Sequence, residues 1–277
     1  MKKIFILTLI IISLNTSAST ISQQEYSQVF KHYNACFILY SLNEQKILTG
    51  YNPQNRCNQR IAADSTFKIP LSLMAFNEGI INQNTVFKWD GQKRMLPEWN
   101  QDQSPRTWLK YSVVWVSQQL TPQLGYARIQ HYLTVFNYGN QDFSGDPGKN
   151  NGLTQAWLSS SLKISAIEQL NFLKAMLSNQ LPINPETVDN TKQNMYQGKL
   201  NNGFNYYGKT GAGVQKQGTK LRDGWFVGFI ENGNQQYIFV SNLTDKTAPL
   251  PTDKSYGAGI LKPITIELLN RYFAGKS

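Results

Sequence analysis

Ser65 and Lys68 are the pair of side chains in this sequence best suited to covalent chemistry. The stretch Ser65-Thr66-Phe67-Lys68 places a hydroxyl and an amine three residues apart near the start of an expected helix, where such side chains lie on one face. A serine needs an adjacent base to become a nucleophile, and burial lowers the pKa of a lysine enough for it to serve as one. The pattern therefore predicts nucleophilic catalysis by Ser65 with Lys68 as its base.

The same pattern occurs a second time at residues 160–163, so it does not identify the site alone. Two segments downstream of Ser65 distinguish the first copy: Ser112-Val113-Val114 and Lys209-Thr210-Gly211. Three short motifs in one order are far less expected by chance than any one of them. A looser match to the middle motif, Ser27-Gln28-Val29, has no such context.

The two downstream motifs supply the remaining chemistry of an acyl-transfer site. Ser112 can relay a proton, and Lys209 provides a fixed positive charge at a strand end. The Thr210 hydroxyl can bind a carboxylate, and Gly211 lets a substrate approach the backbone. We expect the backbone N–H groups of Ser65 and Ala212 to form the oxyanion hole. Read without catalysis, these are a surface lysine, a satisfied core serine and an ordinary strand end.

Taken together, these motifs resemble those of the penicillin-recognising serine enzymes. The middle motif reads Ser-Val-Val, where related classes have Ser-Asp-Asn. With Tyr138-Gly139-Asn140, Trp157-Leu158 and Ser161-Leu162-Lys163-Ile164-Ser165, the chain resembles a class D, oxacillinase-type β-lactamase over nearly its whole length after residue 18.

The resemblance implies a concrete mechanism. Carbon dioxide would add to the neutral amine of Lys68, and the resulting carbamate would be the general base for acylation and deacylation. An apolar pocket favours the neutral amine, and Phe67, Val113 and Val114 suit that purpose. No other cofactor and no metal is expected. The further implied roles are a carbamate donor (Trp157), a proton relay to the lactam nitrogen (Ser112 and Lys209) and a substrate pocket (Thr210, Gly211, Val114 and Leu158).

The chain departs from the family pattern in one place. Many members have an arginine on or before the last helix that grips the substrate carboxylate, and the segment around Lys262 has none. Either Lys262 or Thr210 and other hydroxyls would bind that group. A glutamate in Glu168-Gln169-Leu170-Asn171 resembles the deacylating base of class A enzymes, but it is one residue short and is explained by a capping box with Ser165.

The favoured function is hydrolysis of β-lactam antibiotics such as penicillins and oxacillin, with resistance as its consequence. Two alternatives share the motifs: a cell-wall transpeptidase or carboxypeptidase, whose acyl-enzyme would persist, and a β-lactam sensor that acylates once. We expect small-molecule substrates and a monomer or weak dimer.

Residues 1–18 have the pattern of a secretory signal, with Lys2 and Lys3 before an apolar run too short to span a bilayer. We therefore expect a periplasmic or secreted protein without a membrane span after cleavage. In that compartment Cys36 and Cys57 either form a disulfide or remain two separate buried thiols. The formal charge of +10 is spread over scattered lysines, so nucleic-acid binding is not expected.

Strand patterns at both ends of the chain and helical patterns between them predict an α+β fold. One antiparallel sheet would form from both chain ends, flanked by helices and carrying a mainly helical insertion. We expect a single catalytic unit at 19–277, with an α/β part at about 19–62 and 203–277 and a helical part at about 63–202. The expected elements are a hairpin at 34–50, a helix from 62 to 79 with a tight first turn at 65–69, strands at 206–211, 224–230 and 236–240, and a helix at 258–273.

Overall fold

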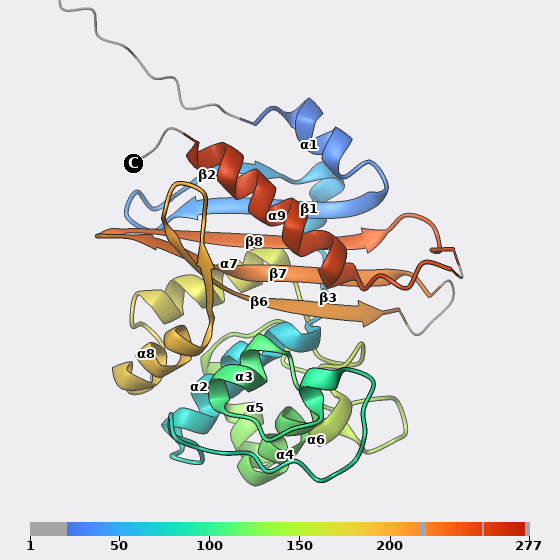
Figure 1. Ribbon diagram of the computed structural model, residues 1–277, viewed down its shortest axis with the longest axis vertical. Coiled ribbons are helices and arrows are strands. Elements are labelled where there is room, and N and C mark those ends of the chain that lie inside the picture. Colours follow the sequence, from blue (N-terminus) through green and yellow to red (C-terminus); the bar gives the residue numbers. More distant parts are fainter. Residues whose placement is uncertain (1–20, 216–219, 251, 275–277) are drawn as a thin grey trace, which may run out of the picture.

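The computed structural model describes residues 21–215, 220–250 and 252–274, so the expected signal at 1–18 lies outside the described residues. A six-stranded antiparallel sheet forms the centre of the molecule, in the order β2-β1-β8-β7-β6-β5 (Figure 1). Its strands are β1 (Tyr33–Ser41), β2 (Lys46–Tyr51), β5 (Tyr196–Lys199), β6 (Asn205–Val214), β7 (Arg222–Asn232) and β8 (Gln235–Asp245).

The pairing of β1 with β8 joins the two ends of the chain. Ile38 faces Val240 across this pair, and the hairpin of β7 and β8 turns at Gly233, which has a φ of 55°. Asn-Gly turns of this kind suit the right-handed twist of paired strands. The prediction of an antiparallel sheet built from both chain ends is therefore confirmed.

Helices cover both faces of the sheet. In Figure 1, α1 (Gln23–Val29) and α9 (Gly257–Phe273) lie on one side, and the other helices gather on the opposite side. Those helices are α2 (Lys68–Asn77), α3 (Pro105–Lys110), α4 (Val114–Leu124), α5 (Tyr126–Val135), α6 (Gly152–Gln155), α7 (Ala166–Leu177) and α8 (Pro185–Asn194). The described residues also form 3₁₀ turns η1 (Pro53–Asn58), η2 (Asp64–Phe67) and η3 (Pro97–Trp99), and a small sheet of β3 (Ile61–Ala62) and β4 (Lys163–Ile164).

Strand β7 separates two apolar cores. Trp225 and Val227 join the larger core beneath the helices, whereas Phe226 and Ile230 join the smaller core beneath α1 and α9. This alternation follows from the period of two in a strand, and almost every residue of β7 is apolar because both faces are covered. The mixed helix and strand architecture agrees with the predicted α+β class. The proposed boundaries between an α/β part and a helical part stay a prediction.

Two local features refine the expected elements. The 3₁₀ turn ends at Phe67 and regular helix begins at Lys68, two residues earlier than the expected start at Pro70. Cys36 and Cys57 form a disulfide that ties β1 to η1, which resolves the alternative left open by the sequence. None of the helices within the described ranges is long and apolar enough to cross a membrane.

Candidate active site

The turn from η2 into α2 brings Ser65 and Lys68 together. Residues three apart eclipse each other in a 3₁₀ turn, and the Lys68 Nζ donates to the Ser65 Oγ over 3.1 Å. Lys68 is fully buried and Ser65 is 8% exposed. The sequence prediction of a serine beside a buried amine is therefore realised in the geometry.

Burial governs the charge of Lys68. Loss of solvation lowers its pKa from 10.5 to about 7, and the nearby carboxyl of Asp64 opposes this shift. Phe67 and Val113, which the sequence analysis assigned to an apolar pocket, are both fully buried. A substantial fraction of the amine is thus neutral near pH 7, as a base or a nucleophile toward carbon dioxide requires.

Trp157 lies beside this turn. Its ring stacks on Phe67 with centroids 5.4 Å apart, and the residue is fully buried. Its indole Nε1 has no hydrogen-bond partner among the described residues. A buried donor without an acceptor costs free energy, typically about 1–3 kcal/mol, so this position calls for an acceptor that the unmodified side chains do not provide.

Ser112 and Lys209 form a second contact across the site. The Lys209 Nζ donates to the Ser112 Oγ at 2.8 Å and to the carbonyl oxygen of Thr210 at 2.9 Å. Ser112 has a φ of 59°, an unusual backbone conformation for a serine that points to a constrained turn just before α4. Burial lowers the pKa of Lys209, helped by the charges of Lys68 and Lys262, while the surrounding oxygens favour the ammonium.

Strand β6 runs along the nucleophile turn, and glycine makes this possible. A Cβ at Gly213 would lie 2.4 Å from the Asp64 Oδ2, and one at Gly211 would lie 3.2 Å from the Thr66 Cγ2. The segment Lys209–Ala212 therefore lies against η2, as the order of the motifs predicted. Val114 begins α4 directly after Ser112, and Leu158 follows Trp157 in a partly exposed turn.

Asp64 is the residue of this site that the sequence analysis missed. It is 1% exposed, has a φ of 44°, and its Oδ1 accepts hydrogen bonds from the N and Oγ of Ser159 at 2.9 and 3.1 Å. Its Oδ2 has no partner among the described residues. Burial and the charge of Asp223 raise its pKa to about 7. An acid one residue before a helical serine looks like an ordinary helix-start residue, so the sequence offered no distinguishing signal.

Lys262 does not point to the catalytic residues. Its Nζ donates to the Gln197 Oε1 at 2.7 Å and lies 5.5 Å from the centre of the Phe226 ring. Phe226 belongs to the core beneath α1 and α9. Of the two alternatives for gripping a carboxylate, this arrangement favours Thr210 and other hydroxyls.

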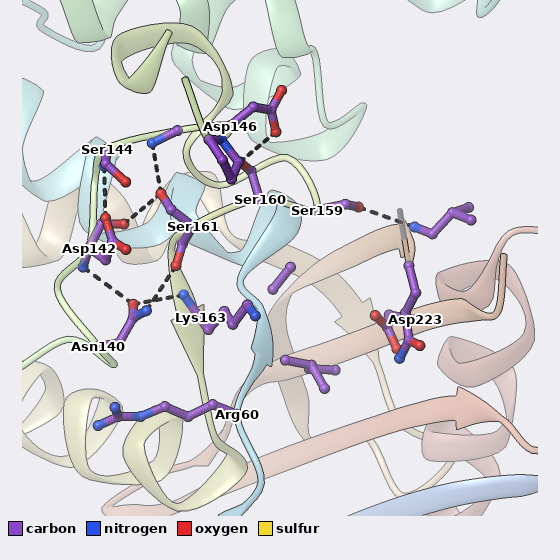
Figure 2. A pocket seen from close by; sticks show the side chains of 16 residues that line it. Arg60, Asn140, Asp142, Ser144, Asp146, Ser159, Ser160, Ser161, Lys163 and Asp223 are labelled. Carbon is purple, nitrogen blue, oxygen red and sulfur yellow. Dashed lines mark hydrogen bonds between the residues drawn. The ribbon is translucent and has the colours of Figure 1, made fainter. Parts of the chain in front are cut away.

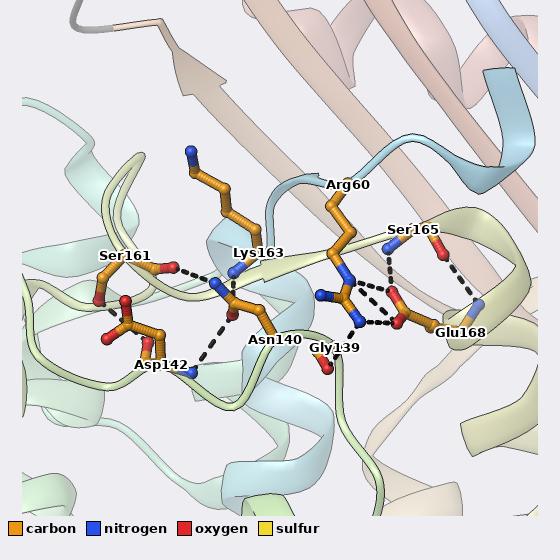
Figure 3. Close-up of polar contacts among 8 residues, drawn as sticks. All are labelled: Arg60, Gly139, Asn140, Asp142, Ser161, Lys163, Ser165 and Glu168. Carbon is orange, nitrogen blue, oxygen red and sulfur yellow. Dashed lines mark hydrogen bonds and ion pairs between the residues drawn. The ribbon is translucent and has the colours of Figure 1, made fainter.

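The look-alike motifs have structural roles. Ser160 donates to the Asp146 Oδ1 at 2.7 Å, and Lys163 is exposed on β4. Glu168 caps α7 through a reciprocal capping box with Ser165, which confirms that prediction, and pairs with Arg60 (Figure 3).

Known proteins with this arrangement form one group. Residues 18–270 match the family model described as the penicillin binding protein transpeptidase domain. The chain is 46% identical over 242 residues to the β-lactamase OXA-1 of Escherichia coli, covering 87% of both chains. It is 34% identical over 229 residues to the methicillin resistance mecR1 protein of Staphylococcus aureus, covering 82% of this chain but 37% of that one.

Solved structures give the same result. The class D β-lactamase OXA-427 has a TM-score of 0.73 and 35% identity, covering 86% of this chain and all of that one. A class D β-lactamase from Bacillus subtilis has a TM-score of 0.78 and 31% identity, covering 94% and 99%. The chain belongs to the class D serine β-lactamases, within the penicillin-binding transpeptidase domain family.

Proposed function

We propose that this protein hydrolyses β-lactam antibiotics through an acyl-enzyme on Ser65 and thereby confers resistance to them. The buried contact of 3.1 Å between the Ser65 Oγ and the Lys68 Nζ is the observation that supports this most directly. The related OXA-1 and OXA-427 proteins are β-lactamases by name. Penicillins and oxacillin-type compounds are the expected substrates.

Lys68 would be carboxylated in the active enzyme. Three features fit a carbamate: an amine whose pKa is lowered to about 7, full burial, and the unpartnered indole N–H of Trp157. When present, this group supplies the general base of the reaction. Carbon dioxide or bicarbonate is the co-reactant this requires, and no metal enters the proposal.

The remaining residues of the site position the substrate and move protons. Thr210 would bind the substrate carboxylate, with Gly211, Val114 and Leu158 lining the pocket, and Ser112 would pass a proton from Lys209 toward the lactam nitrogen. The Lys209 to Ser112 contact of 2.8 Å supports this relay. The backbone N–H groups of Ser65 and Ala212 would stabilise the oxyanion, because β6 lies against the nucleophile turn.

A sensor function is the alternative that a specific observation favours. The methicillin resistance mecR1 protein and the penicillin-receptor domain of Bacillus licheniformis BlaR both match this chain. Such a protein would acylate once and hold the product, and a transpeptidase or carboxypeptidase would release it slowly. We favour turnover, because the likeness to OXA-1 covers 87% of both chains.

Turnover of a chromogenic cephalosporin distinguishes these functions. We expect many turnovers per molecule, a rate that rises when bicarbonate is added to degassed buffer, and no acylation of a Ser65→Ala variant. A single stoichiometric burst would select the sensor, and slow release with exchange onto a peptide amine would select the transpeptidase. Expression of the gene in a susceptible host, with Ser65→Ala as the control, tests resistance.

A further inference from the structure

A separate cavity of about 710 Å³ lies beside the catalytic residues, under the loop at 140–147 (Figure 2). Its walls come from β3, that loop, residues 159–163 and the end of β6, and Asp223 forms part of the floor. Neither Ser65 nor Lys209 lines it. Its volume falls in the range of sites that bind small organic molecules, and no step of the proposed mechanism uses it.

The wall of this cavity is held in place by side-chain hydrogen bonds. The Asn140 Nδ2 donates to the Ser161 carbonyl at 2.8 Å, and the Asn140 Oδ1 accepts from the Lys163 backbone N–H at 2.9 Å. The Ser161 Oγ donates to the Asp142 carbonyl at 3.0 Å and accepts from the Gly145 N–H at 2.9 Å. Figure 3 shows this lacing between the loop and β4. A preformed wall reduces the ordering that a ligand must impose.

A close backbone approach fixes the same wall at its base. A Cβ at Gly139 would lie 2.1 Å from the Lys163 carbonyl oxygen, and Gly139 has a φ of 57°, so only glycine fits there. The Arg60 guanidinium donates to the Gly139 carbonyl at 3.3 Å and pairs with Glu168. The charge of Arg60 is thus already neutralised, and its role is to hold the loop.

Lys163 and Asp142 are the two lining groups with unused charge. Lys163 forms no ion pair or side-chain hydrogen bond among the described residues, and the only hydrogen bond to the Asp142 carboxylate there comes from the Ser144 N–H. They do not pair with each other, and in Figure 3 the Lys163 amine points away from Asp142. A cation and an anion set apart around one hollow are complemented by a molecule with the opposite two charges, an ammonium and a carboxylate.

The cavity and the catalytic site share a wall at Ser159. Ser159 lines the cavity, follows Trp157 and Leu158, and donates twice to the Asp64 Oδ1. Its Oγ also accepts from the Val214 N–H at 3.1 Å. Ser159 has a φ of 49°, so this turn is constrained on both sides. Occupation of the cavity is therefore sensed within a few residues of the Trp157 indole.

We propose that this cavity is a second binding site, for a small zwitterion such as a free amino acid or a short peptide, with its carboxylate on Lys163 and its ammonium on Asp142. The proposal does not depend on the reaction that Ser65 performs. It requires both charges of the ligand, because each of the two lining groups is matched by one of them.

Titration of the purified protein with the dipeptide alanylalanine tests this directly, by calorimetry and by the NMR signal of the Trp157 indole N–H. We expect saturable binding and a shift of that signal. The N-acetylated dipeptide lacks the ammonium and the C-terminal amide lacks the carboxylate. Each should bind at least about tenfold more weakly, as expected for the loss of one charge-assisted contact.

Three variants locate the site. Lys163→Gln should weaken alanylalanine about tenfold or more and should no longer distinguish it from its amide, and Asp142→Asn should no longer distinguish it from its acetylated form. Lys149→Gln, which removes a neighbouring lysine that does not line the cavity, is the matched control and should bind normally. Absence of saturable binding, or binding that survives Lys163→Gln and Asp142→Asn but is lost in Thr210→Val, would overturn the proposal.

Discussion

The chain contains the motif Ser-x-x-Lys twice, and the two copies lie in opposite kinds of surroundings. At Ser65 and Lys68 the motif spans a 3₁₀ turn and the start of α2, where the amine is fully buried and contacts the hydroxyl at 3.1 Å. At Ser160 and Lys163 it runs from a turn into β4, where the hydroxyl bonds to Asp146 and the amine is exposed.

The difference shows that residue types supply the atoms of a site, while backbone and burial supply its chemistry. A helical turn places residues three apart on one face, whereas residues three apart in a strand lie on opposite faces. Burial then makes a neutral amine accessible near neutral pH. The second copy has neither condition, so its lysine remains available for binding an external anion.

Replacing each lysine by alanine should give the largest contrast between the two copies. Lys68→Ala should lower β-lactam turnover by about a thousandfold, in the range expected for loss of a general base, and should abolish stimulation by bicarbonate. Lys163→Ala should leave turnover within about twofold of the original, because surface substitutions of this kind rarely disturb a distant site. Steady-state kinetics with a chromogenic cephalosporin measures both.

The ¹³C NMR spectrum of the protein under labelled carbon dioxide separates a base from a mere structural support. A carbamate signal should be present in the original protein and in Lys163→Ala, and absent in Lys68→Ala. Full turnover by Lys68→Ala would show that the proposed base is wrong.

Trp157→Phe should have the next largest effect, confined to the first copy. The substitution keeps the stacked ring beside Phe67 but removes the one buried indole donor that lacks a partner among the described residues. We expect the bicarbonate concentration for half-maximal activity to rise about tenfold, the equivalent of one lost hydrogen bond to a charged group. Trp108→Phe is the control, because that indole donates to Ser117 instead. An unchanged bicarbonate requirement in Trp157→Phe would contradict the assigned donor.

The pH dependence of carboxylation should follow the lowered pKa of Lys68. Only the neutral amine reacts with carbon dioxide, and this pKa is about 7 in the folded protein against 10.5 in an exposed lysine. At fixed dissolved carbon dioxide, the carbamate signal should therefore be lost as the pH falls below 7, with about tenfold less neutral amine per unit. A signal that stays constant from pH 8 to pH 5 would contradict this, as would one that appears only above pH 10.

Much of this comparison could be anticipated from the sequence. The strands predicted at 206–211, 224–230 and 236–240 lie within β6, β7 and β8, and the capping box of Ser165 and Glu168 formed as expected. Those elements depend on local patterns, namely alternation, an Asn-Gly turn and a cap. The order of the motifs also pointed to the contacts of Lys68 with Ser65 and of Lys209 with Ser112.

Features that depend on tertiary packing could not be anticipated. Asp64 is functionally placed because the chain folds Ser159 against it, across a long sequence separation. The Lys262 side chain turns to Gln197, which depends on how α9 packs on the sheet. The cavity next to Lys163 exists only where four separate segments meet. Nothing in the local sequence of any one segment encodes these meetings.

Ser165→Ala should give the smallest effect and should mark the side of the second copy as structural. The Ser165 Oγ accepts from the Glu168 N–H at 3.2 Å and begins α7, so its loss should lower the free energy of unfolding by about 1 kcal/mol, a usual value for an N-cap. Turnover should be unchanged, because neither residue contacts Ser65 or Lys68. Urea unfolding and steady-state kinetics on the same variant separate the two effects. A loss of deacylation without a loss of stability would instead make Glu168 part of the catalytic machinery and would remove the distinction between the two regions.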